Sequence, residues 1–387
     1  MRFDRRVACK FMAGSLLGVP AALRAVAQDP ADRFSGFPPI GVHRKGERTQ
    51  PVIVSDGVTE VLRPKWTRAM TDLGGWPTMF RFRKEIYLAF YHGDGHRYKQ
   101  HEATDRIKTY RSRDEGRTWT EIASCPPNDP KKFQGTPEFV ATDDTLFCYD
   151  FDANRQTQVR TSADGEHWSE PRNCYKPPFY FWGVIYDRES KMFWCPPHAI
   201  PHTGTSDERQ IHLIRSANGI DWEFVSLVAP YNNASESTLR FEPDRTMTIV
   251  IRRKYGSTCN VAVAKPPYRD WQIFGRPVIA EGEHFYEIGG QTFLASRASY
   301  RGKDERVLNA PQVFDKRRSY STIYRWTQDR QLVEWAVMDS LGDCSYPHLI
   351  ETPTEVLCAY YSQHENGLCK TFLCGYDKAA FLKPLSQ

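Results

Sequence analysis

Long hydrophobic runs are missing from this chain of 387 residues, and so are the short motifs of several large enzyme classes. No stretch reaches the roughly 18 consecutive apolar residues that a membrane-spanning helix needs, so we expect no membrane span. There is no glycine-rich phosphate loop, no G-x-S-x-G turn and no H-E-x-x-H pair. These absences argue against a dinucleotide enzyme, a serine hydrolase and a zinc protease. Amphipathic helix patterns are missing too, which favours an all-β chain.

Closely spaced cysteine pairs are also missing. The chain has ten cysteines, and none of them lies in a C-x-x-C pair, so the sequence predicts no zinc or other metal site. Nothing in the sequence predicts a cofactor. Cys9 lies in an N-terminal apolar segment, and without it nine cysteines remain. An odd number of cysteines in an exported protein leaves at least one thiol free.

The N-terminus has the pattern of an export signal. Arg5 and Arg6 precede an apolar run at residues 11–23, and Ala25-Val26-Ala27 offers a small-x-small cleavage site. The arginine pair resembles a twin-arginine signal, but the residues that usually follow such a pair are absent. Both the Sec route and the Tat route therefore stay open. We expect residues 1–27 to be a signal peptide and the mature protein to be periplasmic or extracellular.

The charge balance changes when this segment is set aside. The full chain has a net charge of +5, and residues 1–27 hold five basic residues against one acidic residue, which leaves about +1 for the rest. No basic stripe interleaved with aromatic residues is present, so we expect no nucleic-acid partner. Residues 28–50 are polar and contain three prolines, which predicts a linker or extended arm before the folded domain.

A turn motif is the clearest signal in the sequence. Residues 112–119 read Ser-Arg-Asp-Glu-Gly-Arg-Thr-Trp, between an apolar run and a short strand-like segment. Asp114 can bond nearby backbone groups, Gly116 tolerates a positive φ, and Ser112 can add a hydroxyl bond inside the loop. Trp119 can then lie over the turn as a large apolar plug. The motif therefore predicts a tightly bonded hairpin turn.

The same turn recurs twice. Residues 162–168 read Ser-Ala-Asp-Gly-Glu-His-Trp, and residues 216–222 read Ser-Ala-Asn-Gly-Ile-Asp-Trp. The interval between their tryptophans is about 50 residues, which is typical of one four-stranded sheet per repeat. Three such turns at nearly constant spacing predict a β-propeller, although unrelated turns could also precede tryptophan by chance.

Short β-rich runs alternate with Gly, Pro and Asp turns from Pro51 onward. We expect residues 51–387 to form the propeller, with an N-terminal segment near residues 51–62 completing the last sheet and a tail or extra strand at residues 377–387. The predicted strands are Ile86–Tyr91, Thr145–Tyr149, Ile211–Arg215, Thr246–Arg252, Gln291–Ser296 and Val356–Tyr361.

The turns resemble the Asp-boxes of the sialidase (neuraminidase) superfamily, also called BNR repeats. Segments within residues 71–96, 235–253, 289–297 and 342–365 resemble a bacterial branch of the same family, and the second and fourth are the most specific. The resemblance implies a six-bladed, all-β propeller. It also implies that the Asp-boxes are structural, so function has to be argued from other residues.

The resemblance assigns roles to four residues. Tyr346 stands where the family has its nucleophilic tyrosine, and Glu236 stands where the family has the base that activates it. Sialidases use tyrosine because a carboxylate nucleophile would be repelled by the carboxylate of the sugar. Arg252 and Arg297 are the residues expected to bind that carboxylate, with Arg253 as the alternative if the strand register differs. Tyr346 could instead be a packing aromatic, and Glu236 an exposed carboxylate.

The chain departs from the family pattern in its first repeat. Where the family has Arg-Ile-Pro, this chain has Gly75-Trp76-Pro77, so the first carboxylate-binding arginine is absent there. Arg81 or Arg83 would have to replace it. With two arginines instead of three, sialic acid itself is in doubt, and a uronic acid or another acidic sugar stays open.

The residue that protonates the leaving group is expected on a loop before the first turn motif. Asp94 and Asp105 are equally good candidates, followed by His96, and each could instead be a solvated loop residue. Trp182 could stack on a sugar face, and His364 could line the same site. Both could also serve only in packing or at the surface.

Together these observations predict an exported sialidase-like exo-glycosidase that releases a terminal acidic sugar from a glycan. Two alternatives stay open. A polysaccharide lyase would use Tyr346 or His96 to remove a proton from a uronate, while Arg297 neutralises its carboxylate. A glycan-binding propeller without catalysis would fit the missing early arginine. The expected partner in every case is an acidic glycan or polysaccharide.

Overall fold

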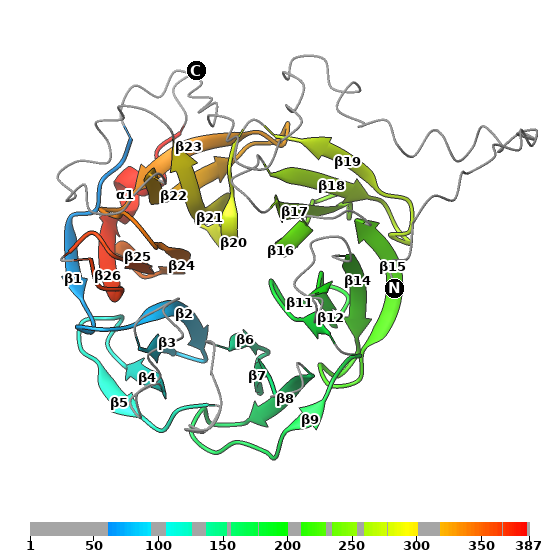
Figure 1. Cartoon of the computed structure of the whole chain (residues 1–387), viewed down its shortest axis with the longest axis horizontal. Helices are drawn as coiled ribbons and strands as arrows, with labels where there is room; N and C mark the ends of the chain where they lie inside the picture. Colours follow the sequence, from blue (N-terminus) through cyan, green and yellow to red (C-terminus); the bar gives the residue numbers. More distant parts are fainter. Residues whose placement is uncertain are drawn as a thin grey trace, which may run out of the picture.

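The strands form six small antiparallel sheets arranged in a ring around a central axis (Figure 1). The structure is a computed structural model, and the residues it describes are 61–93, 106–125, 137–152, 156–176, 178–199, 210–229, 234–253, 259–276, 278–300, 318–365 and 367–384. The predicted signal peptide and linker lie outside these residues. The architecture is the six-bladed β-propeller that the sequence predicts.

The blades follow one another in chain order. Blade 1 contains β2 (Gly75–Phe82), β3 (Glu85–His92), β4 (Arg106–Ser112) and β5 (Thr120–Ile122). Blade 2 contains β6 (Glu138–Ala141), β7 (Leu146–Phe151), β8 (Thr157–Ser162) and β9 (Arg172–Asn173). Blade 3 contains β10 (Phe179–Tyr180), β11 (Ile185–Asp187), β12 (Met192–Cys195), β13 (His198–Ala199), β14 (Ile211–Ser216) and β15 (Glu223–Ala229).

Blades 4 to 6 complete the ring. Blade 4 contains β16 (Ala234–Phe241), β17 (Met247–Arg253), β18 (Asn260–Ala264) and β19 (Gln272–Gly275). Blade 5 contains β20 (Glu281–Ile288), β21 (Gln291–Tyr300), β22 (Arg318–Trp326) and β23 (Leu332–Val337). Blade 6 contains β24 (Ser345–Glu351), β25 (Glu355–Ser362), β26 (Lys370–Asp377) and β1 (Trp66–Ala69). Each strand predicted from the sequence overlaps an observed one, and these are β3, β7, β14, β17, β21 and β25.

The ring is closed by the first strand of the described chain. β1 pairs with β26 in antiparallel register, with Trp66 opposite Gly375 and Ala69 opposite Phe372. The predicted closing segment near residues 51–62 is therefore placed too early, because β1 begins at Trp66. Leu62 instead bridges to Ala336 in blade 5. A Cβ on Gly375 would lie 2.5 Å from the Trp66 indole nitrogen, so only glycine leaves room for this ring.

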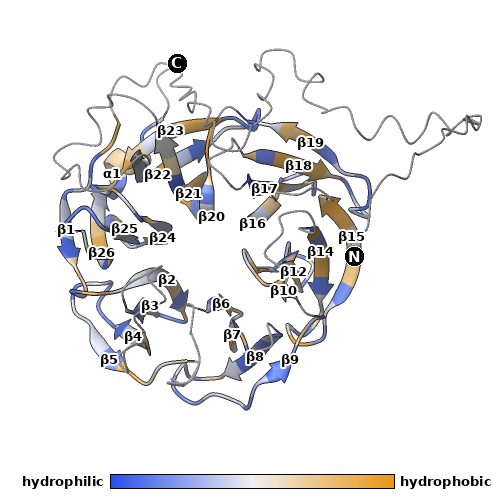
Figure 2. Cartoon of the chain, viewed as in Figure 1, coloured by the Kyte–Doolittle hydropathy of each residue, from blue (hydrophilic) through white to orange (hydrophobic). Residues whose placement is uncertain are grey.

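The hydrophobic core is divided among the interfaces between neighbouring blades. One cluster joins blades 4 and 5 through Val250, Val261 and Leu294, and another joins blades 5 and 6 through Phe293 and Tyr360. Strands buried on both faces, such as β18, are mainly apolar, whereas the short outer strand β9 is hydrophilic (Figure 2). Burial of apolar area between blades thus holds the ring together.

Each recurring turn lies between the third and fourth strands of its blade or, in blade 3, between β14 and β15, and has the bonding predicted for it. In the first, the Ser112 hydroxyl accepts a hydrogen bond of 2.8 Å from the Gly116 N–H, and Asp114 accepts one of 2.8 Å from the Thr118 N–H. The Trp119 indole donates to the Gly116 carbonyl at 3.0 Å. Equivalent serine bonds of 2.8 and 2.9 Å bind Gly165 and Gly219.

The glycine of each turn touches the preceding blade. A Cβ on Gly116 would lie 2.4 Å from Leu357, one on Gly165 would lie 2.7 Å from Tyr87, and one on Gly219 would lie 2.7 Å from Phe147. These three partners sit on β25, β3 and β7, the second strands of blades 6, 1 and 2. The turns therefore join blades to one another as well as closing hairpins.

All nine cysteines of the described residues carry free thiols, which agrees with the predicted free thiol. The predicted C-terminal tail or extra strand is wrong for its first residues, because Lys378–Phe381 form the one-turn helix α1, capped by the Asp377 carboxylate. None of the helices in the described residues has the length and apolarity to cross a membrane.

The contact between turns and blades can be tested with two glycines in the same backbone conformation. Gly219 has φ +73° and would clash with Phe147, whereas Gly290 has φ +72° and nothing within 4 Å of an added Cβ. Gly290→Ala should lower the free energy of unfolding by about 1–2 kcal/mol, the cost of a left-handed residue. Gly219→Ala should cost about 1–3 kcal/mol more, because overpacking adds to that cost. Urea denaturation of both variants measures the difference, and equal losses would show that the turn does not press on the neighbouring blade.

Candidate active site

The inner strands begin with the same irregularity in four blades. The register shifts between Gly75 and Thr78 in β2, and at the corresponding places in β16, β20 and β24. Trp76 and Tyr346 have positive φ values of 50° and 49° at these shifts, and a proline follows each of them. Proline lacks a donor for the ladder and is tolerated in sheets at edges and bulges, so the sequence itself favours a bulge here. These bulges aim side chains at the centre of the ring.

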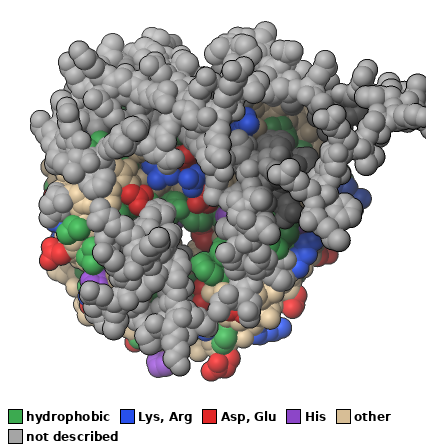
Figure 3. Space-filling view, in the orientation of Figure 1, with side chains coloured by type: hydrophobic (Ala, Val, Ile, Leu, Met, Phe, Trp, Pro, Cys, Tyr) green, Lys and Arg blue, Asp and Glu red, His purple; other side chains and the backbone are tan. Residues whose placement is uncertain are grey.

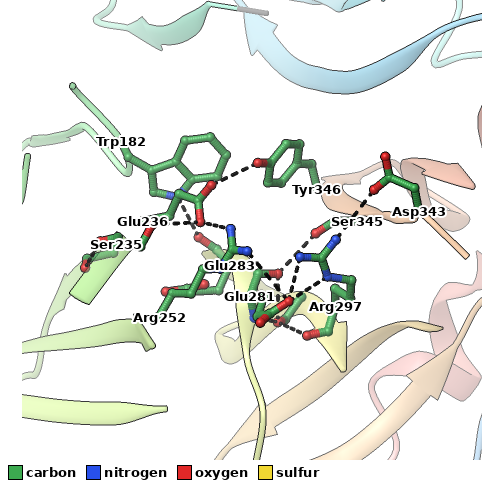
Figure 4. A network of polar contacts seen from close by, with 12 residues as sticks. Trp182, Ser235, Glu236, Arg252, Glu281, Glu283, Arg297, Asp343, Ser345 and Tyr346 are labelled. Atoms are coloured by element: carbon green, nitrogen blue, oxygen red, sulfur yellow. Dashed lines mark hydrogen bonds and ion pairs between the residues drawn. The ribbon is translucent and has the colours of Figure 1, made fainter. Parts of the chain in front are cut away.

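Two of the bulged strands bring Tyr346 and Glu236 together. The Tyr346 hydroxyl on β24 donates a hydrogen bond of 3.0 Å to the carboxylate of Glu236 on β16 (Figure 4). The two residues are 110 positions apart in the chain, so only the closed ring places them in contact. Tyr346 is held in a backbone conformation that costs a non-glycine residue about 1–3 kcal/mol, and such strain clusters at functional sites.

The pair has a defined protonation state. Burial raises the pKa of Tyr346 well above its ordinary value, and the charge of Glu236 raises it further, while the nearby arginines oppose the shift. Burial alone would raise the pKa of Glu236, but the charges of Arg252 and His198 and the hydrogen bonds from Arg252 and Tyr346 together outweigh it and hold this pKa well below the usual range. At neutral pH the proton therefore belongs to Tyr346, and Glu236 is the acceptor.

Arg252 and Arg297 both lie beside this pair, on the second strands of blades 4 and 5. Arg252 Nη1 pairs with Glu236. Arg297 donates from Nη2 and Nε to one oxygen of Glu281, at 2.6 and 2.9 Å. Arg252, the residue that the sequence favours over Arg253, is the one that pairs with Glu236, and Arg253 is the strand partner of Ala234. Figure 3 shows basic and acidic side chains side by side near the centre of this face.

A second buried carboxyl group lies in the same cluster. Glu283 follows Gly282 on β20, is fully buried, and has no hydrogen-bond partner at either carboxyl oxygen among the described residues. Burial raises its pKa well above the ordinary value, and the charge of Glu236 raises it further. The raised pKa favours the neutral form of Glu283, close to the ionised carboxylate of Glu236. Such separation of two neighbouring carboxyl groups is typical of sites that handle protons.

Aromatic rings cover the other side of Tyr346. The Trp182 ring centroid lies 4.8 Å from that of Tyr346, and the Trp182 indole donates to the Glu283 carbonyl at 3.3 Å. Gly282, with φ +64°, gives the tyrosine its space, because a Cβ there would lie 2.3 Å from two ring carbons. The predicted contribution of Trp182 to the site is thus consistent with its position.

Other predicted residues lie elsewhere or outside the described part of the chain. Asp94, His96 and Asp105 are outside the described residues, so the leaving-group acid stays a prediction. His364 contacts the Ser362 hydroxyl and lies against Phe372, which ties it to its own turn.

The proposed replacements for the missing arginine do not reach the centre. Arg81 pairs with Glu115 at 2.6 Å, and Arg83 lies over Phe82 in the turn between β2 and β3. Trp76 occupies the bulge instead, with its ring stacked 5.2 Å from Tyr91.

Sequence reasoning missed Glu281 and Glu283. Their signal was an isolated glycine between two glutamates, which in a strand indicates a bulge or a close approach of another chain segment. No group of three or more His, Cys, Asp or Glu side chains within the described ranges is arranged to hold a metal ion.

No model of a known protein family matches the chain, and no curated protein matches it. Solved structures with the same fold include a Dyadobacter fermentans protein of unknown function, with a TM-score of 0.63 at 16% identity over 81% of this chain and 99% of the other. A Trypanosoma rangeli sialidase mutant with trans-sialidase activity gives 0.57 at 13% identity, over 82% of this chain and 57% of its own.

The Trypanosoma rangeli sialidase in complex with 2,3-difluorosialic acid, described as a covalent intermediate, gives a TM-score of 0.56 at 12% identity, over 86% of this chain and 59% of its own. The chain thus spans well under two thirds of the trypanosomal enzymes. At these identities the likeness shows the fold, a sialidase-like six-bladed propeller, and the activity has to be argued from the site.

The raised pKa of Glu283 predicts a specific dependence of stability on pH. An unfolded glutamate releases its proton near pH 4.3, whereas folded Glu283 keeps it to a higher pH, so stability is lost as pH rises between those two values. Glu283→Gln cannot ionise. The free energy of unfolding of the wild type should therefore fall relative to this variant by up to about 1.4 kcal/mol per pH unit above pH 5.

Urea denaturation of both proteins from pH 5 to 8 measures this slope. Glu170→Gln, at an exposed position, is the matched control and should show no such trend. Parallel stability curves for the wild type and Glu283→Gln would mean that the buried carboxyl is ionised in the folded protein.

Proposed function

We propose that this protein is an exported glycoside hydrolase with sialidase-like chemistry, in which Tyr346 is the nucleophile and Glu236 is its base. The observation that carries the proposal is the 3.0 Å hydrogen bond from the Tyr346 hydroxyl to an ionised, buried carboxylate. A tyrosine is a weak nucleophile while it keeps its proton, and an adjacent base removes this obstacle. The sialidase-like fold supports the proposal as an analogy.

The reaction proceeds in two steps in this proposal. As the bond between the anomeric carbon and the leaving oxygen breaks, the Tyr346 oxygen bonds to that carbon and its proton passes to Glu236. The leaving oxygen receives a proton from an acid, for which Asp94, Asp105 and His96 remain the predicted residues. Water then attacks the anomeric carbon, loses a proton to the same acid group, and Tyr346 regains its proton from Glu236.

The charges around the pair suit this chemistry. The transition state of glycoside cleavage carries positive charge on the sugar ring, and the carboxylate of Glu281, which takes no proton in these steps, stabilises such charge at short range. Arg252 keeps Glu236 ionised before the reaction, so it is ready to accept the proton. Trp182 offers a ring face beside Tyr346, on which the apolar face of a sugar can stack.

The reaction products distinguish this proposal from the two alternatives that the sequence leaves open, the lyase and the binding module. A lyase generates an unsaturated sugar that absorbs ultraviolet light, a hydrolase generates a reducing sugar without that absorbance, and a binding module releases nothing. The acidic character of the sugar, predicted from the two arginines, depends on whether their guanidinium groups are free to bind it.

The nucleophile and base assignment is tested by removing one functional group at a time. Tyr346→Phe keeps the ring and loses only the oxygen, and Glu236→Gln keeps the shape but cannot take the phenolic proton. Each should lower turnover of a glycoside substrate by about a thousandfold or more, and the double variant should be no worse than either, because the two residues act as one unit. Steady-state hydrolysis of fluorogenic glycosides is the measurement.

Tyr149→Phe is the matched control. It also removes one buried tyrosine hydroxyl, which lies on β7 in blade 2 and donates to the Gly219 carbonyl in the turn of blade 3 at 2.8 Å. This variant should lose about 1 kcal/mol of stability and keep its turnover. Unchanged turnover in Tyr346→Phe would return that tyrosine to a packing role and reject the proposal.

A further inference from the structure

The carboxylate of Glu281 lies between the two arginines of the site. Its Oε2 atom accepts hydrogen bonds from Arg297 Nη2 and Nε at 2.6 and 2.9 Å, and it lies 3.7 Å from Arg252 Nη2 (Figure 4). One oxygen of the protein thus bridges both guanidinium groups. This is the position in which a bound carboxylate would be expected between two arginines.

The other terminal nitrogens of the arginines also face protein acceptors. Arg297 Nη1 donates to the Cys344 carbonyl at 3.3 Å and lies 3.7 Å from Asp343, and Arg252 Nη1 pairs with Glu236. Every terminal nitrogen of the two guanidinium groups therefore has a partner. The side chains are also deeply set, with 15% of Arg252, 11% of Arg297 and 5% of Glu281 exposed.

Glu281 is fixed at its backbone. Its N–H donates to the Ser296 hydroxyl at 2.9 Å, and its carbonyl accepts from the Ser345 hydroxyl at 3.1 Å. The next residue, Gly282, is packed against the Tyr346 ring. A buried carboxylate with a fixed backbone and two cationic partners is a permanent part of the site, because removing it would leave buried charges unpaired.

The charge balance of the cluster disfavours a further anion. Glu236, Glu281 and Asp343 contribute three carboxylates, which the guanidinium groups of Arg252 and Arg297 and the charge of His198 beside Glu236 already balance. A substrate carboxylate placed against these arginines would meet Glu281 at contact distance, and like charges at such distances repel strongly in a partly desolvated site. Neutral hydroxyl groups meet no such barrier.

Blade 1 contributes a ring where a third cation would be needed. Trp76 and Tyr346 occupy equivalent bulges, with the same φ and a following proline, so both side chains are set at the inner end of their blades. Trp76 packs in one cluster with Tyr361 and Tyr346. Trp76 is buried in that cluster, so blade 1 adds no positive charge to the site at this position.

We propose that the sugar bound at the cleavage point is a neutral pyranoside, and that Glu281 supplies from the protein the negative charge that an acidic sugar would bring as its own carboxylate. Glu281 stays ionised throughout and exchanges no proton; it stabilises positive charge on the sugar ring. This inference rests on the proposed hydrolase function. It replaces the acidic sugar predicted from the sequence, because that prediction requires free guanidinium groups.

The first measurement uses the unaltered protein. Calorimetry with free sugars compares N-acetylneuraminic acid and glucuronic acid with neutral hexoses and N-acetylhexosamines, and 4-methylumbelliferyl glycosides of the same sugars report turnover. We expect the kcat/KM of at least one neutral glycoside to exceed that of both acidic glycosides by about a hundredfold or more. Tighter binding and faster cleavage of an acidic sugar would overturn the inference.

The second measurement changes Glu281. Glu281→Gln keeps the shape and removes the charge, so it should bind N-acetylneuraminic acid at least about tenfold more tightly than the unaltered protein does, and hydrolyse neutral glycosides more slowly. Glu281→Asp, which keeps the charge, is the second variant in case the first fails to fold, and it should go on excluding acidic sugars. Glu115→Gln removes a carboxylate that pairs with Arg81 outside the site and should change neither property.

The two proposals fail in different ways. If no glycoside is cleaved but Glu281→Gln gains affinity for the acidic sugar, the hydrolase proposal fails and the role of Glu281 as occupant of the arginine pair stands. If glycosides are cleaved and Glu281→Gln binds acidic sugars no better than the unaltered protein, the hydrolase proposal stands and this inference is wrong.

Discussion

Two guanidinium groups buried at the centre of the ring have to be neutralised, and this requirement orders the site. Charges taken out of water are costly unless they are paired and hydrogen-bonded. Glu236 and Glu281 meet that need for Arg252 and Arg297, and each carboxylate comes from the bulged start of an inner strand. A bulge of the same kind at the start of β24 positions the ring of Tyr346, so the ion pairs and the proposed nucleophile depend on the same type of backbone irregularity.

The ring itself depends on contacts between consecutive blades. Apolar clusters fill the interfaces, and turn glycines at three blades press on the second strand of the blade before them. A blade that shifted against its neighbour would move its inner strand as well. The 3.0 Å contact between Tyr346 and Glu236, which joins blades 4 and 6 across the ring, therefore reports on the packing of blade 5 between them.

Much of the fold could be predicted from the sequence, because its signals are local. The turn at Ser112 to Trp119 needs only neighbouring residues, and the run at Gln291–Ser296 falls inside β21. The resemblance to a family also assigned Tyr346 and Glu236 to one site. Glu281 and Glu283 were missed, because the glycine between them indicates only a bulge, a glutamate in a strand usually faces solvent, and their burial depends on blades that fold around them. The closing strand was misplaced for a similar reason, since the register of β1 is set by β26.

The pairing of β1 with β26 also has a consequence for how the molecule assembles. The other five blades draw their strands from continuous stretches of chain, so each can pair its own strands soon after they are made. Blade 6 needs a strand from each end of the domain, and its closure is the contact of longest sequence separation, which is slow because the intervening loop must first be brought together. Before blade 6 closes, β1 and the outer edge of β26 are unpaired, and the β1 or β26 strand of a second copy of the chain can pair with them instead. The domain is therefore most exposed to strand exchange between molecules in the last step of its folding.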